Sequence, residues 1–137
     1  RAPEAVPRDR VRVDVPESLP LVHADPGLVE RSIANVVENA VRYSPSDSPV
    51  LVTASRLGPA VEVRVVDRGP GVPDESKPQL FESFQRLGDT PAGDGVGLGL
   101  AVARGLVDLV GGTLLAEDTP GGGLTMVVTL PTAEEAP

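Results

Sequence analysis

The chain lacks cysteine and tryptophan, and it has one lysine and three aromatic residues in 137. The absence of cysteine excludes disulfide bonds and thiolate metal sites, but it fixes no cellular compartment. The lysine, Lys77, precedes a proline, so the Gly-Lys-Ser/Thr run of a Walker-type phosphate loop is missing. No apolar run reaches the length of a membrane span, and no signal peptide is visible.

A basic surface is also missing, because the formal net charge is −8. This charge argues against a general nucleic-acid or anionic-membrane binder, so we expect no nucleic-acid partner. The length is that of one domain with a hydrophobic core, and the 40% apolar content is typical of a globular protein. Because the sequence starts at Arg1 rather than Met, we expect it to be a fragment of a larger protein.

Hydrophobic periodicity predicts an α/β domain with a mixed sheet covered on one face by helices. We expect a lead-in or linker over residues 1–9, the domain over 10–131 and a disordered tail over 132–137. The helical pattern covers residues 28–43, 79–86 and 98–110. Asp25-Pro26 predicts the start of the first helix, with Asp25 as N-cap and Pro26 as first helical residue, and Ser44-Pro45 predicts its end. The predicted strands span residues 11–15, 50–56, 61–66, 113–117 and 124–130, with a hairpin around Gly58-Pro59.

The first long helix carries Asn35 and Asn39 one turn apart, with Arg42 beside them on the same face. Asparagine offers a neutral carbonyl oxygen that suits Mg²⁺ already carrying triphosphate charge. Arg42 could add a cation to the same phosphates. The alternative is an ordinary solvated helix face, although asparagine is a poor helix former in mid-helix.

Two glycine clusters follow this helix, and both suit a nucleotide. Asp67 ends a strand ahead of Gly69 and Gly71, so its carboxylate could accept the exocyclic amine of adenine while the glycines let a flat base approach the backbone. The run 95–100 leads into a helix whose free N–H groups suit a polyphosphate. An ordinary turn and a flexible hinge are the respective alternatives.

Two further segments are less specific. Phe81 and Phe84 are three residues apart, which is typical of core packing, and Arg86 after them either reaches phosphate or is a surface charge. The third glycine cluster, residues 121–123, is predicted chiefly as a turn between strands.

Taken in order, these motifs resemble the catalytic ATP-binding domain of sensor histidine kinases, in the gyrase, Hsp90, histidine kinase and MutL superfamily. The resemblance covers roughly residues 10–131. The N box of the family resembles residues 35–43, its first glycine box 67–71, its F box 81–86 and its second glycine box 95–100.

The resemblance implies a Bergerat-type two-layer α/β sandwich that binds ATP and Mg²⁺. Asn39, assisted by Asn35, would bind the metal, and these two with Arg42 would form the catalytic set. Asp67 would recognise adenine. The implied nucleotide-binding residues are Asn39, Arg42, Tyr43, Asp67, Gly69, Gly71, Arg86, Gly95, Gly97, Leu98, Gly99 and Leu100.

One position separates the branches of this superfamily. Its hydrolases and serine kinases carry a glutamate base four residues before the metal-binding asparagine, whereas this sequence has Asn35 there. The resemblance therefore implies a protein histidine kinase domain that passes the γ-phosphate of ATP to an external nucleophile. The alternatives are a catalytically inactive nucleotide sensor and an ATPase clamp of the gyrase or MutL type.

The partners implied are a histidine-bearing dimerisation domain of the same receptor and a response regulator. The phosphoacceptor histidine helix is absent from this sequence. The domain would be cytoplasmic, within a sensor anchored in the bacterial inner membrane. Two departures are Val110, where the family usually has histidine, and Arg42 in place of the commoner lysine. The segments 84–89 and 119–126 look most like the potassium-responsive Kdp sensor kinases.

Overall fold

The computed structural model describes residues 8–20, 22, 24–82 and 96–132. In this part of the chain, five strands form one mixed sheet with the order β1-β2-β3-β5-β4. The strands are β1 (Val11–Asp14), β2 (Val50–Leu57), β3 (Ala60–Val66), β4 (Thr113–Asp118) and β5 (Leu124–Pro131). β1 runs parallel to β2, and the other neighbouring strands are antiparallel.

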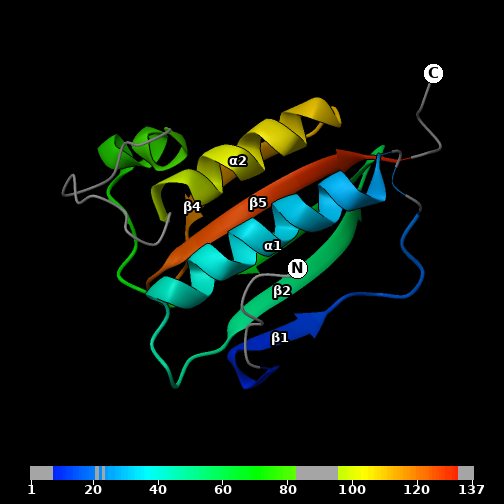
Figure 1. The fold of residues 1–137 in the computed structure, drawn as a ribbon. Helices are drawn as coiled ribbons and strands as arrows, with labels where there is room; N and C mark the ends of the chain where they lie inside the picture. The colour runs from blue at the N-terminus through cyan, green and yellow to red at the C-terminus, as the bar shows by residue number, and fades with distance from the viewer. Residues whose placement is uncertain (1–7, 21, 23, 83–95, 133–137) are drawn as a thin grey trace.

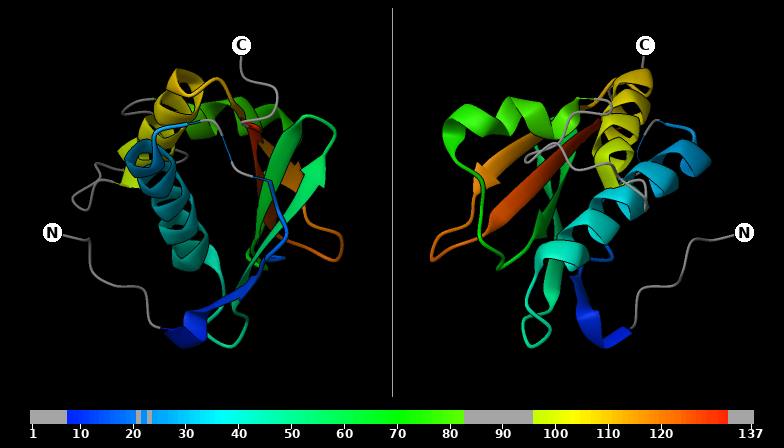
Figure 2. Two further views of the ribbon diagram at one scale, coloured as in Figure 1. Left: turned by 90° about the vertical axis from the view of Figure 1, so that its right-hand side faces the viewer. Right: turned by 60° about the vertical axis from the view of Figure 1, so that its left-hand side comes forward.

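Two α-helices, α1 (Pro26–Tyr43) and α2 (Val96–Leu109), lie side by side across one face of the sheet (Figures 1 and 2). Two short 3₁₀ helices, η1 (Arg8–Arg10) and η2 (Asp74–Phe81), complete the described elements. The two-layer α/β architecture predicted from periodicity is confirmed. No helix in the described ranges is long and apolar enough to cross a membrane.

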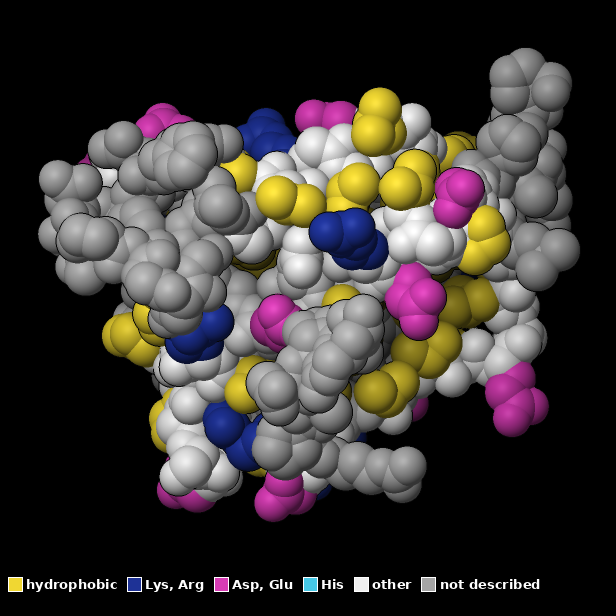
Figure 3. Space-filling model, viewed as in Figure 1, with side chains coloured by type: hydrophobic (Ala, Val, Ile, Leu, Met, Phe, Trp, Pro, Cys, Tyr) yellow, Lys and Arg dark blue, Asp and Glu magenta, His cyan; other side chains and the backbone are white. Residues whose placement is uncertain are grey.

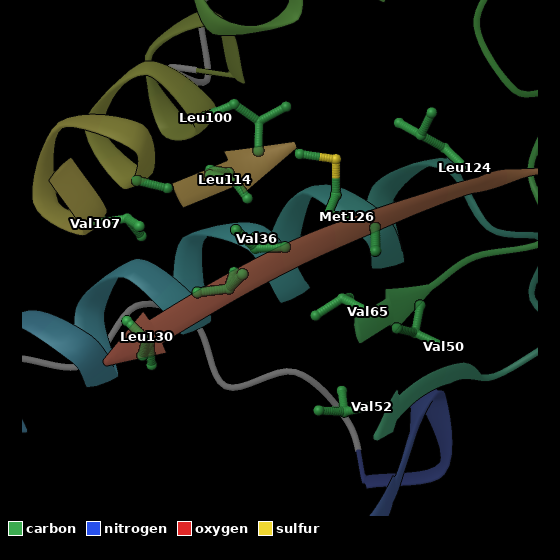
Figure 4. Packing of buried hydrophobic residues seen from close by; sticks show 13 residues of the cluster. Val36, Val50, Val52, Val65, Leu100, Val107, Leu114, Leu124, Met126 and Leu130 are labelled. Atoms are coloured by element: carbon green, nitrogen blue, oxygen red, sulfur yellow. The ribbon is translucent and has the colours of Figure 1, made fainter. Parts of the chain in front are cut away.

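The hydrophobic core fills the space between the helices and the sheet (Figure 4). Val36 from α1 and Val107 from α2 are fully buried against Val65, Met126 and Val128 of the central strands. The opposite side of α2 is less covered, and apolar side chains are exposed along it (Figure 3). The buried cluster therefore consists of aliphatic side chains and one methionine, in keeping with the few aromatic residues in the sequence.

Helix α1 begins at Pro26, as the pair Asp25-Pro26 predicts. The side chain of Asp25 caps it by accepting hydrogen bonds from the N–H groups of Gly27 (2.8 Å) and Leu28 (3.2 Å). Ser44 forms the C-terminal cap, as its position before Pro45 predicts. Helix α2 ends at a turn in which Gly111 has a φ of +83° and Gly112 donates to the Val107 carbonyl.

Two elements differ from the sequence-based expectation. The segment 79–86, predicted as a helix, belongs to η2 over residues 79–81 and is extended at Glu82, and residues 83–86 lie outside the described residues. Helix η2 follows Pro73 and contains Pro78, a residue that prevents a regular α-helix. β1 is an edge strand in which only Val11 is partly buried and Val13 is 65% exposed, so its alternation does not produce a half-buried strand. Thr132, placed in the predicted tail, is buried and donates its N–H to the Pro59 carbonyl.

Candidate functional site

The two candidate metal ligands lie on α1, four residues apart. The predicted polar face of this helix is only partly exposed: Arg31 and Arg42 are exposed, whereas Asn35 and Asn39 are half-buried. The reason is geometric, because an α-helix turns by about 100° per residue and Asn39 lies only about 60° from Val36 in the buried stripe. The two amides therefore border the core instead of pointing into bulk solvent.

The C-terminal end of α1 is tied to the loop that follows β3. Ser44 is buried, and its Oγ accepts a hydrogen bond of 3.2 Å from the backbone N–H of Arg68. Gly69 packs so closely on α1 that a Cβ atom there would overlap the carbonyl oxygen of Tyr43. The first glycine of the predicted adenine loop is thus required for contact with the helix.

Asp67 is the best-defined residue of this loop. Its side chain is 3% exposed, and its Oδ1 accepts hydrogen bonds from the backbone N–H groups of Gly69 (2.9 Å) and Leu124 (3.0 Å). Two donors from different parts of the chain fix the plane of the carboxylate. Because both bonds from described residues go to Oδ1, the second oxygen is the one available to a ligand.

The second glycine cluster is described only from residue 96 onward. Gly97 and Leu98 belong to the first turn of α2, where the backbone N–H groups of a helix lack intrahelical acceptors. Gly99 has open space around it, whereas the side chain of Leu100 is 3% exposed and belongs to the core. Leu100 therefore anchors the helix below the predicted site. Arg86 and Gly95 lie outside the described residues.

Helix η2 connects the loop after β3 to the rest of the domain through Lys77. Its Nζ donates hydrogen bonds to the Val72 carbonyl (2.8 Å), Asp74 Oδ1 (2.7 Å) and Asp118 Oδ1 (2.8 Å). These two carboxylates, Asp118 first, raise the pKa of Lys77, and the hydrogen bond from Lys77 lowers the pKa of Asp74. The loop is thus held to the end of β4.

At the end of η2, the guanidinium carbon of Arg104 from α2 lies 4.8 Å from the centre of the Phe81 ring. This cation–π contact joins the F-box segment to α2. Phe81 is partly buried against the core, as its spacing predicts. Phe84 lies outside the described residues.

An open cleft of about 320 Å³ lies between the loop after β3 and the β4–β5 turn. Its walls are formed by Pro70, Gly71, Val72, Pro73, Asp118, Thr119, Gly122 and Gly123. Gly71 has a φ of +77°, a conformation that glycine adopts without strain. This residue turns the loop next to Gly123.

Sequence reasoning missed three residues that shape the site: Ser44, Lys77 and Leu124. Each contacts a segment far away in the chain: Ser44 through its hydroxyl group, Lys77 through an ion pair with Asp118, and Leu124 through its backbone N–H. No local pattern signals such contacts. The clue available for Ser44 was its place directly after the asparagine-bearing helix.

The fold and the site define a class of protein: an α/β sandwich of the Bergerat type, in which an asparagine-bearing helix meets a buried aspartate and its glycine loop. Residues 24–134 match the family described as histidine kinase-, DNA gyrase B-, and HSP90-like ATPase. The chain belongs to this family, as the order of the motifs predicts.

Among curated proteins, the chain is 51% identical over 129 residues to the sensor protein KdpD of Mycobacterium tuberculosis strain H37Rv. The match covers 94% of this chain and 15% of that protein, so the chain spans a small part of its relative. The full-length ShkA structure in complex with AMPPNP is 31% identical with a TM-score of 0.75, covering 90% of this chain and 26% of that chain.

The mycobacterial sensor histidine kinase MprB is 28% identical with a TM-score of 0.74, and the match covers 91% of this chain and 86% of that chain. These likenesses bear out the function expected from the sequence at the level of the domain. The chain is a histidine-kinase-type ATP-binding catalytic domain.

Proposed function

We propose that this domain binds Mg·ATP between α1 and the loop after β3, and that it donates the γ-phosphate to a histidine on a separate dimerisation domain of the same receptor. The phosphohistidine then supplies the phosphoryl group to an aspartate of a response regulator. The similarity to the sensor protein KdpD supports a potassium-responsive receptor anchored in the bacterial inner membrane, with this domain on the cytoplasmic side.

The observation that carries this proposal is the pair Asn35 and Asn39 on α1. A hydrolase of this family needs a carboxylate base four residues before the metal-binding asparagine, and Asn35 has no basic atom at neutral pH. Water at the γ-phosphate would therefore not be activated by this position. The phosphoryl group is kept for a nucleophile that approaches from another domain.

Asp67 recognises the base in this account. A buried carboxylate whose Oδ1 is occupied by two backbone donors offers Oδ2 to the exocyclic amine of adenine. Guanine carries a carbonyl oxygen at the equivalent position, and two acceptors repel each other. Gly69 and Gly71 let this loop pack closely against Tyr43 of α1 and against Gly123, and Arg42 and Tyr43 form the last turn of α1 at this site.

Magnesium fits the residues present. Half-buried amide oxygens are neutral, hard ligands that suit an ion whose charge is matched by a triphosphate. Asn39, with Asn35 beside it, would hold the ion, and the ion would neutralise charge on the β- and γ-phosphates. Arg42, Arg86, Gly95, Gly97, Leu98 and Gly99 are assigned to the phosphates.

The chemistry asks little of the protein beyond position and charge. A neutral imidazole nitrogen of the acceptor histidine forms the new N–P bond as the bond from the γ-phosphorus to the β–γ bridging oxygen breaks. ADP leaves with the electron pair of that bond. The domain holds the nucleotide in line for this displacement and supplies no covalent intermediate.

The test is to mix this domain with the histidine-bearing domain of its parent and γ-labelled ATP. We expect acid-labile label on that histidine, and no label when the histidine is replaced by glutamine. ATP binding without transfer to a competent acceptor would instead indicate a nucleotide sensor. Rapid release of labelled inorganic phosphate would indicate an ATPase.

A further inference from the structure

The third glycine cluster, residues 121–123, lies against the backbone of Asp67, the residue proposed to bind adenine. Gly123 has a φ of +118°, and a Cβ atom there would overlap the carbonyl oxygen of Asp67. The same atom would be 2.8 Å from the carbonyl carbon of Asp67 and 2.9 Å from the Cα of Arg68. Nothing larger than a hydrogen atom fits between these two backbone segments.

Hydrogen bonds lock this contact in place. The N–H of Asp67 donates to the Leu124 carbonyl at 3.0 Å, and the N–H of Leu124 donates to Asp67 Oδ1, also at 3.0 Å. A Cβ atom built on Gly71 would lie 3.3 Å from the carbonyl oxygen of Gly123, so this glycine also packs closely on the turn. The start of β5 therefore fixes the position of the Asp67 carboxylate.

The turn that carries Gly123 is itself rigid. The N–H of Thr119 donates to the Gly123 carbonyl at 3.0 Å, and the N–H of Gly122 donates to the Thr119 carbonyl at 2.8 Å. The hydroxyl groups of Thr119 and Thr125 form a buried hydrogen bond of 2.8 Å beneath it. A displacement of this turn would therefore be passed on to Asp67 instead of being absorbed locally.

We infer that Gly123 is a positioning residue for base recognition: by fitting against the Asp67 backbone, it orients the carboxylate that selects adenine. This inference rests on the proposed function, in which Asp67 reads the exocyclic amine. The β4–β5 turn then contributes to nucleotide binding by orienting Asp67, in addition to connecting the two strands.

The chain provides a matched control in the neighbouring residue. Gly122 has a φ of +119°, close to that of Gly123, but no atom lies within 4 Å of a Cβ built on it. The variants Gly122→Ala and Gly123→Ala therefore share the same unfavourable backbone conformation. They differ in whether the added methyl group collides with Asp67 and Arg68.

The experiment measures the affinities of the wild-type domain and both variants for ATP and for purine riboside triphosphate, which lacks only the exocyclic amine. Unfolding curves for each variant define the temperature at which all are folded. We expect wild-type and Gly122→Ala to prefer ATP by about 10- to 100-fold, the range for a hydrogen bond to a charged group. In Gly123→Ala we expect nearly equal affinities for the two nucleotides, because affinity for ATP falls while affinity for purine riboside triphosphate stays at the wild-type value.

Equal preferences for ATP in the two variants would overturn the inference. A wild-type domain that binds both nucleotides equally would instead overturn base recognition by Asp67, which separates failure of the proposed function from failure of the inference. If Gly123→Ala does not fold, Thr119→Val removes the hydroxyl bond beneath the turn, and we expect about a threefold loss of the ATP preference. An unchanged preference in Thr119→Val would then contradict the inference.

Discussion

The hydroxyl oxygen of Ser44 and the backbone N–H of Arg68 are joined by a hydrogen bond of 3.2 Å. This contact links the end of the asparagine-bearing helix to the loop that carries Asp67. The two halves of the proposed site, one for the metal and phosphates and one for the base, are therefore held in a fixed relation by the fold itself.

Replacing Ser44 with alanine should weaken this link. The N–H of Arg68 would lose its partner in a partly buried place, so we expect the free energy of unfolding in urea to fall by about 1 kcal/mol. Ser46→Ala, in the same loop but exposed, is the control and should change it little. A Ser44→Ala domain as stable as the control would show that the link contributes nothing.

Replacing Asp67 with asparagine should damage base recognition and preserve the fold. The amide oxygen can still accept the N–H groups of Gly69 and Leu124, but its NH₂ group then faces the amine of adenine, donor to donor. We expect ATP affinity, measured by calorimetry, to fall by about 10- to 100-fold. Affinity for purine riboside triphosphate should stay near the wild-type value, and an equal loss for both nucleotides would refute the assigned role.

Replacing Asn39 with alanine should remove the magnesium dependence of nucleotide binding. The wild-type domain should bind ATP about tenfold more tightly with Mg²⁺ than with EDTA, whereas Asn39→Ala should bind equally in both. Arg31→Ala on the same helix is exposed and serves as the control. A magnesium effect that persists in Asn39→Ala would place the ion elsewhere.

The Lys77 network predicts a pH dependence of stability. The pKa of Asp74 is lowered in the fold, so its contribution is present above the unfolded value of about 3.9 and is lost as the pH falls through the folded pKa. The pKa of Lys77 is raised, so its contribution is complete at neutral pH and is lost only as the pH rises through a folded pKa above the ordinary value of about 10.4.

Melting temperatures measured across the acid range test this coupling. Lys77→Met should unfold at a lower temperature than wild-type at neutral pH, and the difference should shrink as the pH falls below about 4. Asp118→Asn keeps the pair between Lys77 and Asp74, so it should keep that part of the acid dependence. A difference between wild-type and Lys77→Met that stays constant with pH would contradict the proposed coupling.

The sequence predicted the main elements because their signals are local. Asp25-Pro26 and Ser44-Pro45 bound α1, and the two valine-rich runs around Gly58-Pro59 form the hairpin of β2 and β3. The parallel pairing of β1 with β2 could not be predicted in this way, because it joins segments separated by the whole of α1. The exposure of Val13 also follows from the edge position of its strand, not from its own neighbours.

The candidate site was also inferred from local signals. The order of Asn39, Asp67 and the glycine clusters indicates a nucleotide site. From the sequence, however, the cluster 121–123 is predicted only as a turn. The structure adds that Gly123 lies against Asp67, which is a contact between residues far apart in the chain. The half-buried state of Asn35 is likewise set by the packing of α1 on the core.

The proposed function requires one Mg·ATP to lie between the asparagine-bearing helix and the Asp67 loop. The most direct measurement is a titration of the ¹⁵N-labelled domain with Mg·AMPPNP, followed by NMR. We expect the largest shifts to occur together, at a single dissociation constant, for the side-chain amides of Asn35 and Asn39 and the backbone amides of Gly69 and Leu124. Shifts confined to other parts of the chain, with these four groups unchanged, would contradict it.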